Sequence, residues 1–435
     1  MNNPNPAPSS ITSKFADLEQ QRNSRKNAPY LSNFFGTIYV AITTIMLAYG
    51  GLIGFGAILV MYALWLPKIV YKGVFLLRPT KDVIFVMLLP IVAIMSVAWS
   101  DYPSNTIKSA MEYASLLVCT VIISKTVRTE ALLRGFVIGS TIALIASVAS
   151  QQYGLDPLTG QYTLIGLFGS KNMIGLFAEL GILFSLISLY VRQPMISKLI
   201  FAVGPLGICV VSLYLSKSAS SVLTLALTLA VIIGARFITR LPRAMRTITL
   251  VGFTLIVLFV TVIGTMYDAQ KLVLKSFGKD STLTGRTYLW IEGYKSGMET
   301  PYFGHGYQAF WVEGRAKAEI LWDKFGVPAR IGFHFHDLYV ETFVELGLFG
   351  VILIAAIMLI TCWISLRCII KKGMTVEYVY ALSVSFLFFI RAIVEVDLIG
   401  TFIIGPVLFF SVIPKLATYH QEQALAKMQM HSGTG

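Results

Sequence analysis

The sequence contains few charged residues and few cysteines for its length. Only 13% of the 435 residues are charged, 56% are hydrophobic, and the mean hydropathy is +0.72. A soluble protein of this length needs more polar side chains to cover its surface. The four cysteines, at positions 119, 209, 362 and 368, lie in or beside apolar runs. A disulfide framework is therefore not expected, and the composition indicates a membrane protein.

The N-terminus lacks the apolar segment of a cleavable signal peptide. Residues 1–34 are polar and rich in Asn, Pro and Ser, and no apolar run begins before position 35. We therefore expect these residues to form a polar tail that is kept in the protein.

Apolar runs long enough to cross a hydrocarbon layer of about 30 Å recur along the rest of the chain. Twelve are predicted, at 35–50, 52–67, 83–99, 107–124, 134–152, 172–191, 199–215, 219–235, 247–266, 338–366, 376–392 and 398–414. The first two form one nearly continuous apolar stretch that is too long for a single span. Gly50, Gly51, Gly54 and Gly56 predict a turn between them. The fold class expected is an all-α polytopic membrane protein with about twelve transmembrane helices.

The formal charge of +13 comes from short basic clusters between apolar runs, a pattern of membrane topology and not of nucleic-acid binding. The two tails and alternate connections hold 22 of the 35 basic residues and six acidic ones. The positive-inside rule then places both termini in the cytoplasm and the loop at 267–337 on the opposite face. The predicted order is a tail at 1–34, nine helices in 35–266, a large periplasmic loop at 267–337, three helices in 338–414, and a tail at 415–435.

The loop at 267–337 has the density of aromatic residues expected of a folded and functional segment. Its twelve aromatic residues from 288 to 335 can stack on sugars, form a membrane-interface belt, or pack against one another. The segment from Thr284 to Pro301 predicts a short helix, with Thr284 as N-cap and Arg286 in the first turn. The loop closes with FHFHDLYVETFVELGLFG, in which Asp337, Glu341 and Glu345 share one helical face.

Two histidines, His334 and His336, lie at the boundary between this loop and the next span. A histidine in that place can be a general base, a metal ligand or a polar interface residue. No metal site is expected, because the His-x-His pattern alone is weak and no HExxH motif accompanies it.

The loop motifs GRTYLW, PYFGHG and HFHDLYVETFVELGLFG resemble the signature of the O-antigen ligase and polysaccharide polymerase family. Further similarity lies in VAWSDYP at 97–103, GLFGSKNMIG at 166–175 and LSKSASS at 215–221. The resemblance implies a GT-C-like inner-membrane glycosyltransferase without metal or other cofactor. Its implied donor is an undecaprenyl-pyrophosphate-linked oligosaccharide, and its acceptor is a sugar hydroxyl. Polysaccharide chain-length and export proteins are possible partners, and nucleic acid is not.

The same resemblance implies roles for individual residues. Arg286 matches the family's loop arginine and is expected to bind pyrophosphate, because a guanidinium matches phosphate oxygens bidentately. His336 matches the family histidine that deprotonates or binds the acceptor. Lys217 stands where the family often has a Ser-Arg turn, so lysine is expected to act there as a point charge. Lys171 and Asn172 are further candidates for the diphosphate site, although a solvated turn is equally compatible with them.

Three ionisable residues, Arg391, Glu395 and Asp337, are expected to be structural or to contact the acceptor. Arg391 lies in an apolar run, with Glu395 at i+4 and Asp397 beyond it. Buried ionisable residues in a membrane serve a function or pair with one another, and pairing is favoured here.

An exopolysaccharide polymerase has three alternatives: an O-antigen ligase, a transporter or flippase, and a structural partner without activity. An exopolysaccharide polymerase is favoured over an O-antigen ligase that transfers glycan to lipid A-core, but both use the same donor. A transporter or flippase predicts internal repeats or a gating motif, and residues 68–81 contain no such motif. A structural partner without activity does not explain a loop that carries Arg286 and His336 together.

Overall fold

The computed structural model describes residues 31–72, 77–155, 162–191, 194–242, 245–246 and 284–432. Within these ranges the protein is mostly helical, and its strands form one short antiparallel hairpin, β1 (Tyr153–Leu155) with β2 (Tyr162–Leu164). The N-terminal half contains α2 (Asn33–Ala48), α3 (Gly50–Ile53), α4 (Phe55–Trp65), α5 (Pro67–Lys72), α6 (Lys81–Met95), η2 (Ser96–Trp99), α7 (Pro103–Thr126) and α8 (Thr129–Ala149). The predicted helical class is confirmed.

The remaining helices begin after the β-hairpin. They are η3 (Gly166–Phe168), α9 (Lys171–Ser188), α10 (Met195–Lys198), the π-helical turn η4 (Leu199–Val203), α11 (Gly204–Ser216), α12 (Ala219–Arg240), α15 (Thr284–Gly297), α16 (Ala316–Lys324), α17 (Leu338–Lys372), α18 (Val376–Arg391) and α19 (Ile404–Ser432). Among the described residues, seven helices are long and apolar enough to cross a membrane, and two apolar helices near the N-terminus are shorter. The protein is therefore a polytopic membrane protein. The predicted span at 247–266 and residues 267–283 of the predicted loop lie outside the described residues.

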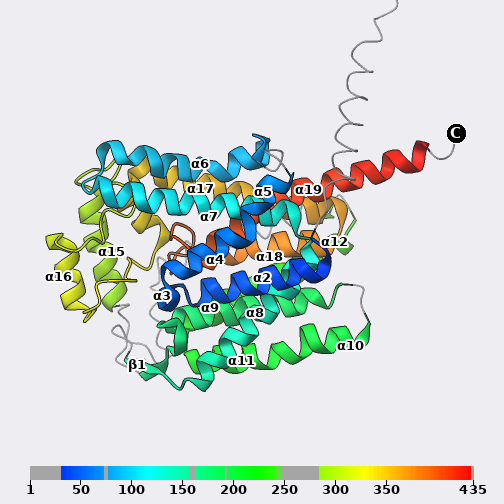
Figure 1. The fold of residues 1–435 in the computed structure, drawn as a ribbon, viewed down its shortest axis with the longest axis horizontal. Helices are drawn as coiled ribbons and strands as arrows, with labels where there is room; N and C mark the ends of the chain where they lie inside the picture. The colour runs from blue at the N-terminus through cyan, green and yellow to red at the C-terminus, as the bar shows by residue number, and fades with distance from the viewer. Residues whose placement is uncertain are drawn as a thin grey trace, which may run out of the picture.

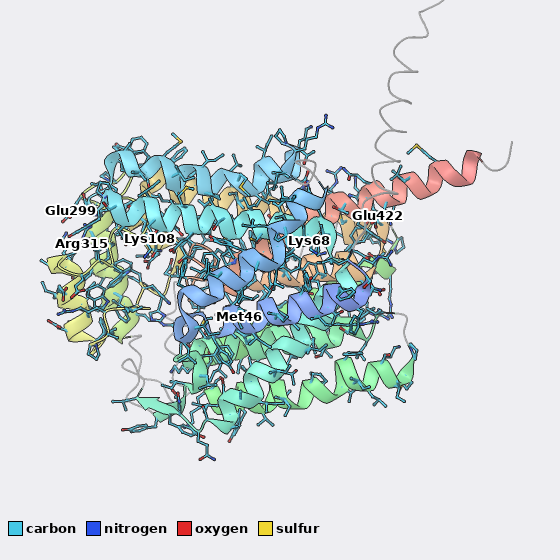
Figure 2. All side chains as sticks on the ribbon, viewed as in Figure 1. Met46, Lys68, Lys108, Glu299, Arg315 and Glu422 are labelled. Atoms are coloured by element: carbon cyan, nitrogen blue, oxygen red, sulfur yellow. The ribbon has the colours of Figure 1, made fainter. Side chains whose placement is uncertain are left out.

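The long helices form one bundle, with α15 and α16 at one end and the last helix, α19, extending past the opposite end (Figure 1). Side chains at these two ends are labelled in Figure 2, where Glu299 and Arg315 lie at the α16 end and Lys68 and Glu422 toward the other. The described part of the predicted loop therefore caps one end of the bundle, and the predicted basic connection at Lys68 lies away from it.

The predicted hairpin of the first two apolar runs is confirmed. Trp65 at the end of α4 donates from Nε1 to Oγ1 of Thr43 in α2, at 2.9 Å. Lys68 lies over the ring of Tyr39 near the start of α2, 5.0 Å from its centroid. The turn between the helices falls at Gly54, which has φ +62°.

Helix α8 packs closely on α2 through a Gly-x-x-x-Gly pair. A Cβ at Gly135 would meet the backbone of Thr37, and a Cβ at Gly139 would meet the backbone of Ala41. Small residues at this spacing let two membrane helices approach at backbone distance. The contact anchors the N-terminal hairpin to the rest of the bundle.

The predicted span at 338–366 is wrong as one continuous span, because α17 is two helical segments joined at Gly347. That residue has φ +64° and ψ −165°, outside the helical region. The amide of Leu348 donates instead to the carbonyl of Pro301 at 2.8 Å. The amide of Phe349 donates to the carbonyl of Tyr302 at 3.2 Å. The segment 338–346 therefore packs with the loop, and the longer apolar segment begins at Leu348.

The predicted span at 398–414 is also wrong at its start, since α19 begins only at Ile404. Residues 392–403 form an irregular segment that is largely inaccessible to solvent apart from Ile393, although several of them are apolar. The carbonyl of Leu398 accepts from the hydroxyl of Tyr113 at 2.8 Å, and that of Ile399 accepts from the hydroxyl of Tyr307. Side chains thus satisfy backbone groups that a helix would satisfy internally. Helix α19 continues from the span into the predicted C-terminal tail, which is helical as far as Ser432.

Candidate functional site

The described part of the loop has a small apolar core of its own. Leu289 of α15, Phe310, Trp322 of α16, Phe335 and Val344 of α17 are buried together in it. Trp290 lies beside this core and donates from Nε1 to the carbonyl of Phe335 at 3.0 Å. Many of the loop aromatics therefore pack against one another, and this core holds the segment that carries both histidines.

His336 occupies a constrained turn directly before α17. Its φ is +53°, which is uncommon outside glycine, and its amide donates to Nδ1 of His334 at 3.1 Å. Asp337 is the N-cap of α17, and its Oδ1 accepts from the amides of Tyr339 at 2.8 Å and Val340 at 3.0 Å. Asp337 is thus a capping residue, so the backbone on both sides of His336 is held in place.

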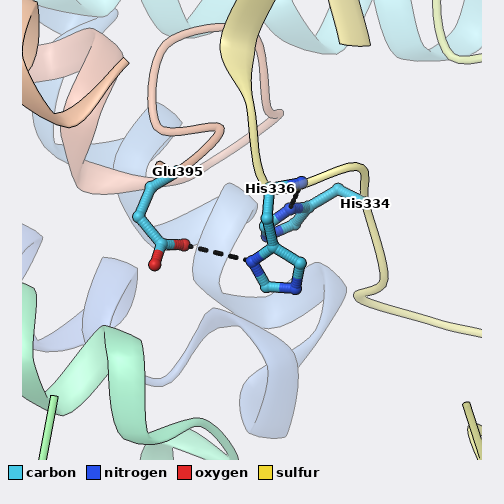
Figure 3. Close-up of side chains that lie close together, drawn as sticks. All are labelled: His334, His336 and Glu395. Atoms are coloured by element: carbon cyan, nitrogen blue, oxygen red, sulfur yellow. Dashed lines mark hydrogen bonds and ion pairs between the residues drawn. The ribbon is translucent and has the colours of Figure 1, made fainter. Parts of the chain in front are cut away.

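Glu395 lies where the loop meets the bundle, and its carboxylate contacts both predicted catalytic residues. Its Oε1 is 3.1 Å from the guanidinium of Arg286, and its Oε2 is 3.5 Å from Nδ1 of His336 (Figure 3). Ser220, at the start of α12, donates to Oε1 at 3.2 Å. The Glu395 side chain is only 4% exposed. Residues far apart in the sequence therefore meet around one buried carboxylate.

The charges around Glu395 outweigh its burial. Burial by itself raises the pKa of this carboxyl, but its contact with His336 and the positive charges of Arg286 and Arg391 hold the pKa well below its usual range. Glu395 is therefore ionised at neutral pH. An ionised carboxylate facing Nδ1 favours a proton on that nitrogen and leaves Nε2 of His336 as the acceptor.

Arg391 is paired as expected, and of its two predicted acidic neighbours Asp397 is a partner while Glu395 is not. Its guanidinium contacts Asp397 at 2.6 Å and Glu179 of α9 at 2.5 Å, and it donates to Oγ of Ser221 at 3.2 Å. The predicted i+4 partner was Glu395. The Glu395 amide does donate to the carbonyl of Arg391, but its carboxylate faces Arg286 and His336. Arg391 thus joins α9, α12, α18 and the 392–403 segment next to the site.

The predicted diphosphate residues are only partly brought together. Asn172, in the first turn of α9, accepts from Oγ of Ser218 at 3.3 Å, and the turn 216–221 also supplies Ser220 to Glu395. Lys171 is half-buried at the first position of α9. Lys217 is exposed, with φ +49°, and its Nζ contacts the carbonyl of Tyr162 at 3.5 Å. Its position beside the β-hairpin differs from that of Arg286.

Two residues of this region were not singled out from the sequence. Ser220 lies in a noted motif, but nothing in its local pattern indicates a carboxylate partner. Glu179 carried a usable signal, because an acidic residue inside an apolar run is unusual. Thr224 donates to Glu179 at 2.6 Å, so both of its carboxylate oxygens have partners.

The third loop histidine, His305, is buried away from Glu395. Its Nδ1 lies 2.8 Å from Asp101, and its Nε2 lies 3.0 Å from the carbonyl of Ser296. Arg315 contacts the same carboxylate of Asp101 at 3.0 Å. His305 therefore joins α15 to the segment before α7 and has no free ring nitrogen.

His334, His336 and Glu395 place one potential metal-ligand atom each within 4.8 Å of one another. Two contacts oppose the binding of a cation there. Nδ1 of His334 accepts from the amide of His336, so a neutral His334 ring carries its proton on Nε2. Arg286 already pairs with the carboxylate of Glu395 that a cation would need, and its positive charge repels a cation there. The prediction that this chain has no metal site stays a prediction.

Comparison with known proteins gives two matches. Residues 204–355 match the family model described as O-antigen ligase. The match covers Lys217, Arg286 and His336 but ends before Arg391 and Glu395. The exopolysaccharide production protein ExoQ of Rhizobium meliloti (strain 1021) is 33% identical over 396 residues, which are 91% of this chain and 91% of that protein.

Proposed function

The chain belongs to the O-antigen ligase and polysaccharide polymerase family, and on that premise we propose that it is an exopolysaccharide polymerase. It transfers undecaprenyl-pyrophosphate-linked oligosaccharide repeat units to a sugar hydroxyl at the periplasmic face of the inner membrane. The observation that carries this proposal is the meeting of Arg286 and His336 on the carboxylate of Glu395.

Arg286 suits the leaving group. One of its terminal nitrogens is engaged by Glu395, and the remaining N–H groups of a guanidinium can bind pyrophosphate oxygens. Asn172 and the serines of the turn 216–221 supply neutral hydrogen-bonding groups nearby. Lys171 and Lys217 are assigned a weaker role, as positive charges that attract the diphosphate.

His336 suits the acceptor. Its Nε2 takes the proton of the sugar hydroxyl while that oxygen bonds to the anomeric carbon of the donor. The bond from this carbon to the pyrophosphate oxygen breaks, and its electron pair leaves with undecaprenyl pyrophosphate. Glu395 faces Nδ1 and stabilises the imidazolium that forms, so its role resembles that of the carboxylate in a catalytic triad. No metal ion takes part in this scheme.

The proposal includes a topology and a fold type. Twelve transmembrane helices in a GT-C-like arrangement place both termini in the cytoplasm and residues 267–337 in the periplasm. The support is the 22 of 35 basic residues in the tails and alternate connections. Polysaccharide chain-length and export proteins are the partners that would receive the product.

A polymerase is favoured over a ligase because the relative with 91% coverage is named for exopolysaccharide production. The description of the matching family model keeps O-antigen ligase as the second candidate. The two differ in acceptor, since a polymerase extends a lipid-linked glycan and a ligase glycosylates lipid A-core. Offering each acceptor separately with the same donor distinguishes them.

The central test is a transfer assay with purified protein in nanodiscs, lipid-linked oligosaccharide donor and chelator present. We expect transfer in chelator, and His336→Ala should lower the rate about 10²–10⁴-fold because a positioned base is lost. His334→Ala should cost much less, since His334 accepts from the amide of His336 and packs against its ring at 4.2 Å, so it supports the base without replacing it. His420→Ala is a matched control, because that ring contacts Tyr378 and is remote from Glu395.

Near-normal transfer by His336→Ala would remove the base assignment. Loss of wild-type transfer in chelator, with loss in both His334→Ala and His336→Ala, would instead indicate a metal site. Donor binding should persist in His336→Ala, which separates loss of chemistry from loss of folding.

A further inference from the structure

The turn that precedes the two glycines at 304 and 306 exposes two large aromatic side chains. Tyr302 is 69% exposed and Phe303 is 56% exposed. Other aromatics of the loop, such as Phe310, Trp322 and Phe335, are buried in its core. An exposed pair of this size needs a partner, because apolar surface in water is unfavourable.

The backbone of this turn is fixed, so the exposure of the two side chains follows from the fold. The carbonyls of Pro301 and Tyr302 accept from the first amides of the longer α17 segment. The carbonyl of Phe303 accepts from Nε1 of Trp99 at 2.9 Å, and the two rings lie 5.4 Å apart. The turn is therefore held between Trp99 at the end of η2, directly after α6, and the kink in α17, and both of its aromatic side chains are exposed.

Both neighbouring helices present their outward apolar face at this turn. On α6 the exposed large apolar residues are Ile84, Leu88, Ile91 and Met95, at helical spacing. On α17 they are Leu348, Phe349, Ile352, Leu359, Ile360 and Trp363. Such stripes on membrane-spanning helices face lipid. Tyr302 and Phe303 lie next to the point where the two stripes end.

Helix α15 adds a third apolar stripe. Ile291, Tyr294 and Met298 are exposed at spacings of three and four residues, and Tyr302 follows four positions later. The opposite face of α15 packs on α17, where Gly293 meets Val340 and Gly297 meets Phe343. The outward side of α15 therefore carries an apolar strip although the helix lies in the loop, and the exposed Lys295 and Glu299 border this strip.

We propose that Tyr302, Phe303 and the outward face of α15 insert into the headgroup region of the bilayer on the loop side. Continuity with the lipid-facing stripes of α6 and α17 identifies the partner as lipid. Aromatic rings favour this depth, and an amphipathic helix binds there through its apolar face. Lys295 and Glu292 of α15 contact each other at 2.8 Å and supply the polar flank. The insertion fixes the height of the loop above the membrane, and it does not depend on the proposed chemistry.

Spin-label accessibility in nanodiscs of phosphatidylethanolamine and phosphatidylglycerol tests this proposal. The four native cysteines are buried, which limits background labelling. A label at Phe303→Cys should collide more with oxygen than with a water-soluble nickel complex, as a label at Ile352→Cys should. A label at Glu313→Cys, whose side chain is 80% exposed in the same loop, should show the opposite preference.

Tyr302→Cys provides a second variant if Phe303→Cys does not fold. A label at 302 or 303 that collides with nickel as strongly as the label at 313 would show a water-facing turn and overturn the proposal. A label shielded from both agents would show a protein partner or a second copy at this surface, which also overturns it. Loss of transfer activity alone would bear on the proposed function and not on this insertion.

Discussion

At the scale of single residues, Glu395 has two neighbours with different proposed tasks. Arg286 is expected to hold the diphosphate, His336 is expected to take a proton, and the same carboxylate contacts both. A negative diphosphate bound at Arg286, as proposed, should weaken the pairing of Arg286 with Glu395 and leave more of the carboxylate charge for His336. Donor binding would in this way prepare the base for the acceptor.

Replacement of Arg286 by lysine tests whether the geometry of the guanidinium matters or only its charge. A single ammonium cannot contact Glu395 and clasp a diphosphate in a planar fork, so we expect Arg286→Lys to be severely impaired at normal expression. Arg330→Lys is a matched control, because Arg330 pairs with Glu319 at 2.7 Å on the loop surface. Full transfer activity of Arg286→Lys would reduce Arg286 to a generic charge.

His334 should make the protein less stable as the pH falls. Burial is the main cause that lowers the pKa of His334 to about 3. An unfolded histidine has a pKa of about 6.5, so between these values the unfolded chain binds more protons than the folded one. The free energy of unfolding therefore decreases from about pH 6.5 toward about pH 3.

His334→Asn should flatten this dependence, because asparagine does not titrate and its side-chain oxygen can still accept from the amide of His336. The measurement is the thermal unfolding midpoint of purified protein at about pH 7 and about pH 5. The drop between the two should be smaller in the variant. An equal drop in both proteins would mean that other groups control the acid response.

At the scale of the elements, the departures from prediction occur where a distant segment replaces helical hydrogen bonds. The run at 398–414 is apolar enough for a span, yet hydroxyls of Tyr113 and Tyr307 bind the carbonyls of Leu398 and Ile399 at its start. The kink at Gly347 is satisfied by Pro301 and Tyr302. Hydropathy reports whether a segment is buried, but not which partner binds its backbone, so neither break was predictable from a local pattern.

Gly347→Ala should destabilise the protein through this kink. Its backbone conformation is nearly exclusive to glycine, and a Cβ there would collide with the backbone of Tyr302 and Phe303. Strain of this kind costs about 1–3 kcal/mol before the collision is counted. We expect a lower thermal unfolding midpoint for Gly347→Ala and a detached turn at 301–303. In Gly207→Ala, the matched control in α11, the Cβ meets nothing within 4 Å, and its midpoint should be unchanged or higher. Equal midpoints in the two variants would contradict the role assigned to the kink.

At the scale of the whole molecule, the membrane class, the N-terminal hairpin and the loop at one end of the bundle were predictable from hydropathy and glycine placement. Arg286 and His336 were predicted from a family resemblance, and no alternation or periodicity singled them out. That Glu395 joins them, and that Glu179 replaces it beside Arg391, depends on contacts across 109 and 212 residues of chain. Such contacts leave no local signal in a single sequence.

The orientation of the whole molecule is the remaining prediction, and it depends on the charges at the two ends of the bundle. Basic clusters are retained in the cytoplasm, so the loop should face the periplasm and Arg240 at the end of α12 the cytoplasm. Because the four native cysteines are buried, single introduced cysteines can report the side. In intact spheroplasts Glu313→Cys should react with a membrane-impermeant maleimide, and Arg240→Cys should react only after permeabilisation. Both positions are exposed, so a difference in labelling reflects sidedness and not burial. The reverse pattern would place Arg286, His336 and Glu395 on the cytoplasmic side, where no periplasmic acceptor could reach them, and would exclude the proposed polymerase.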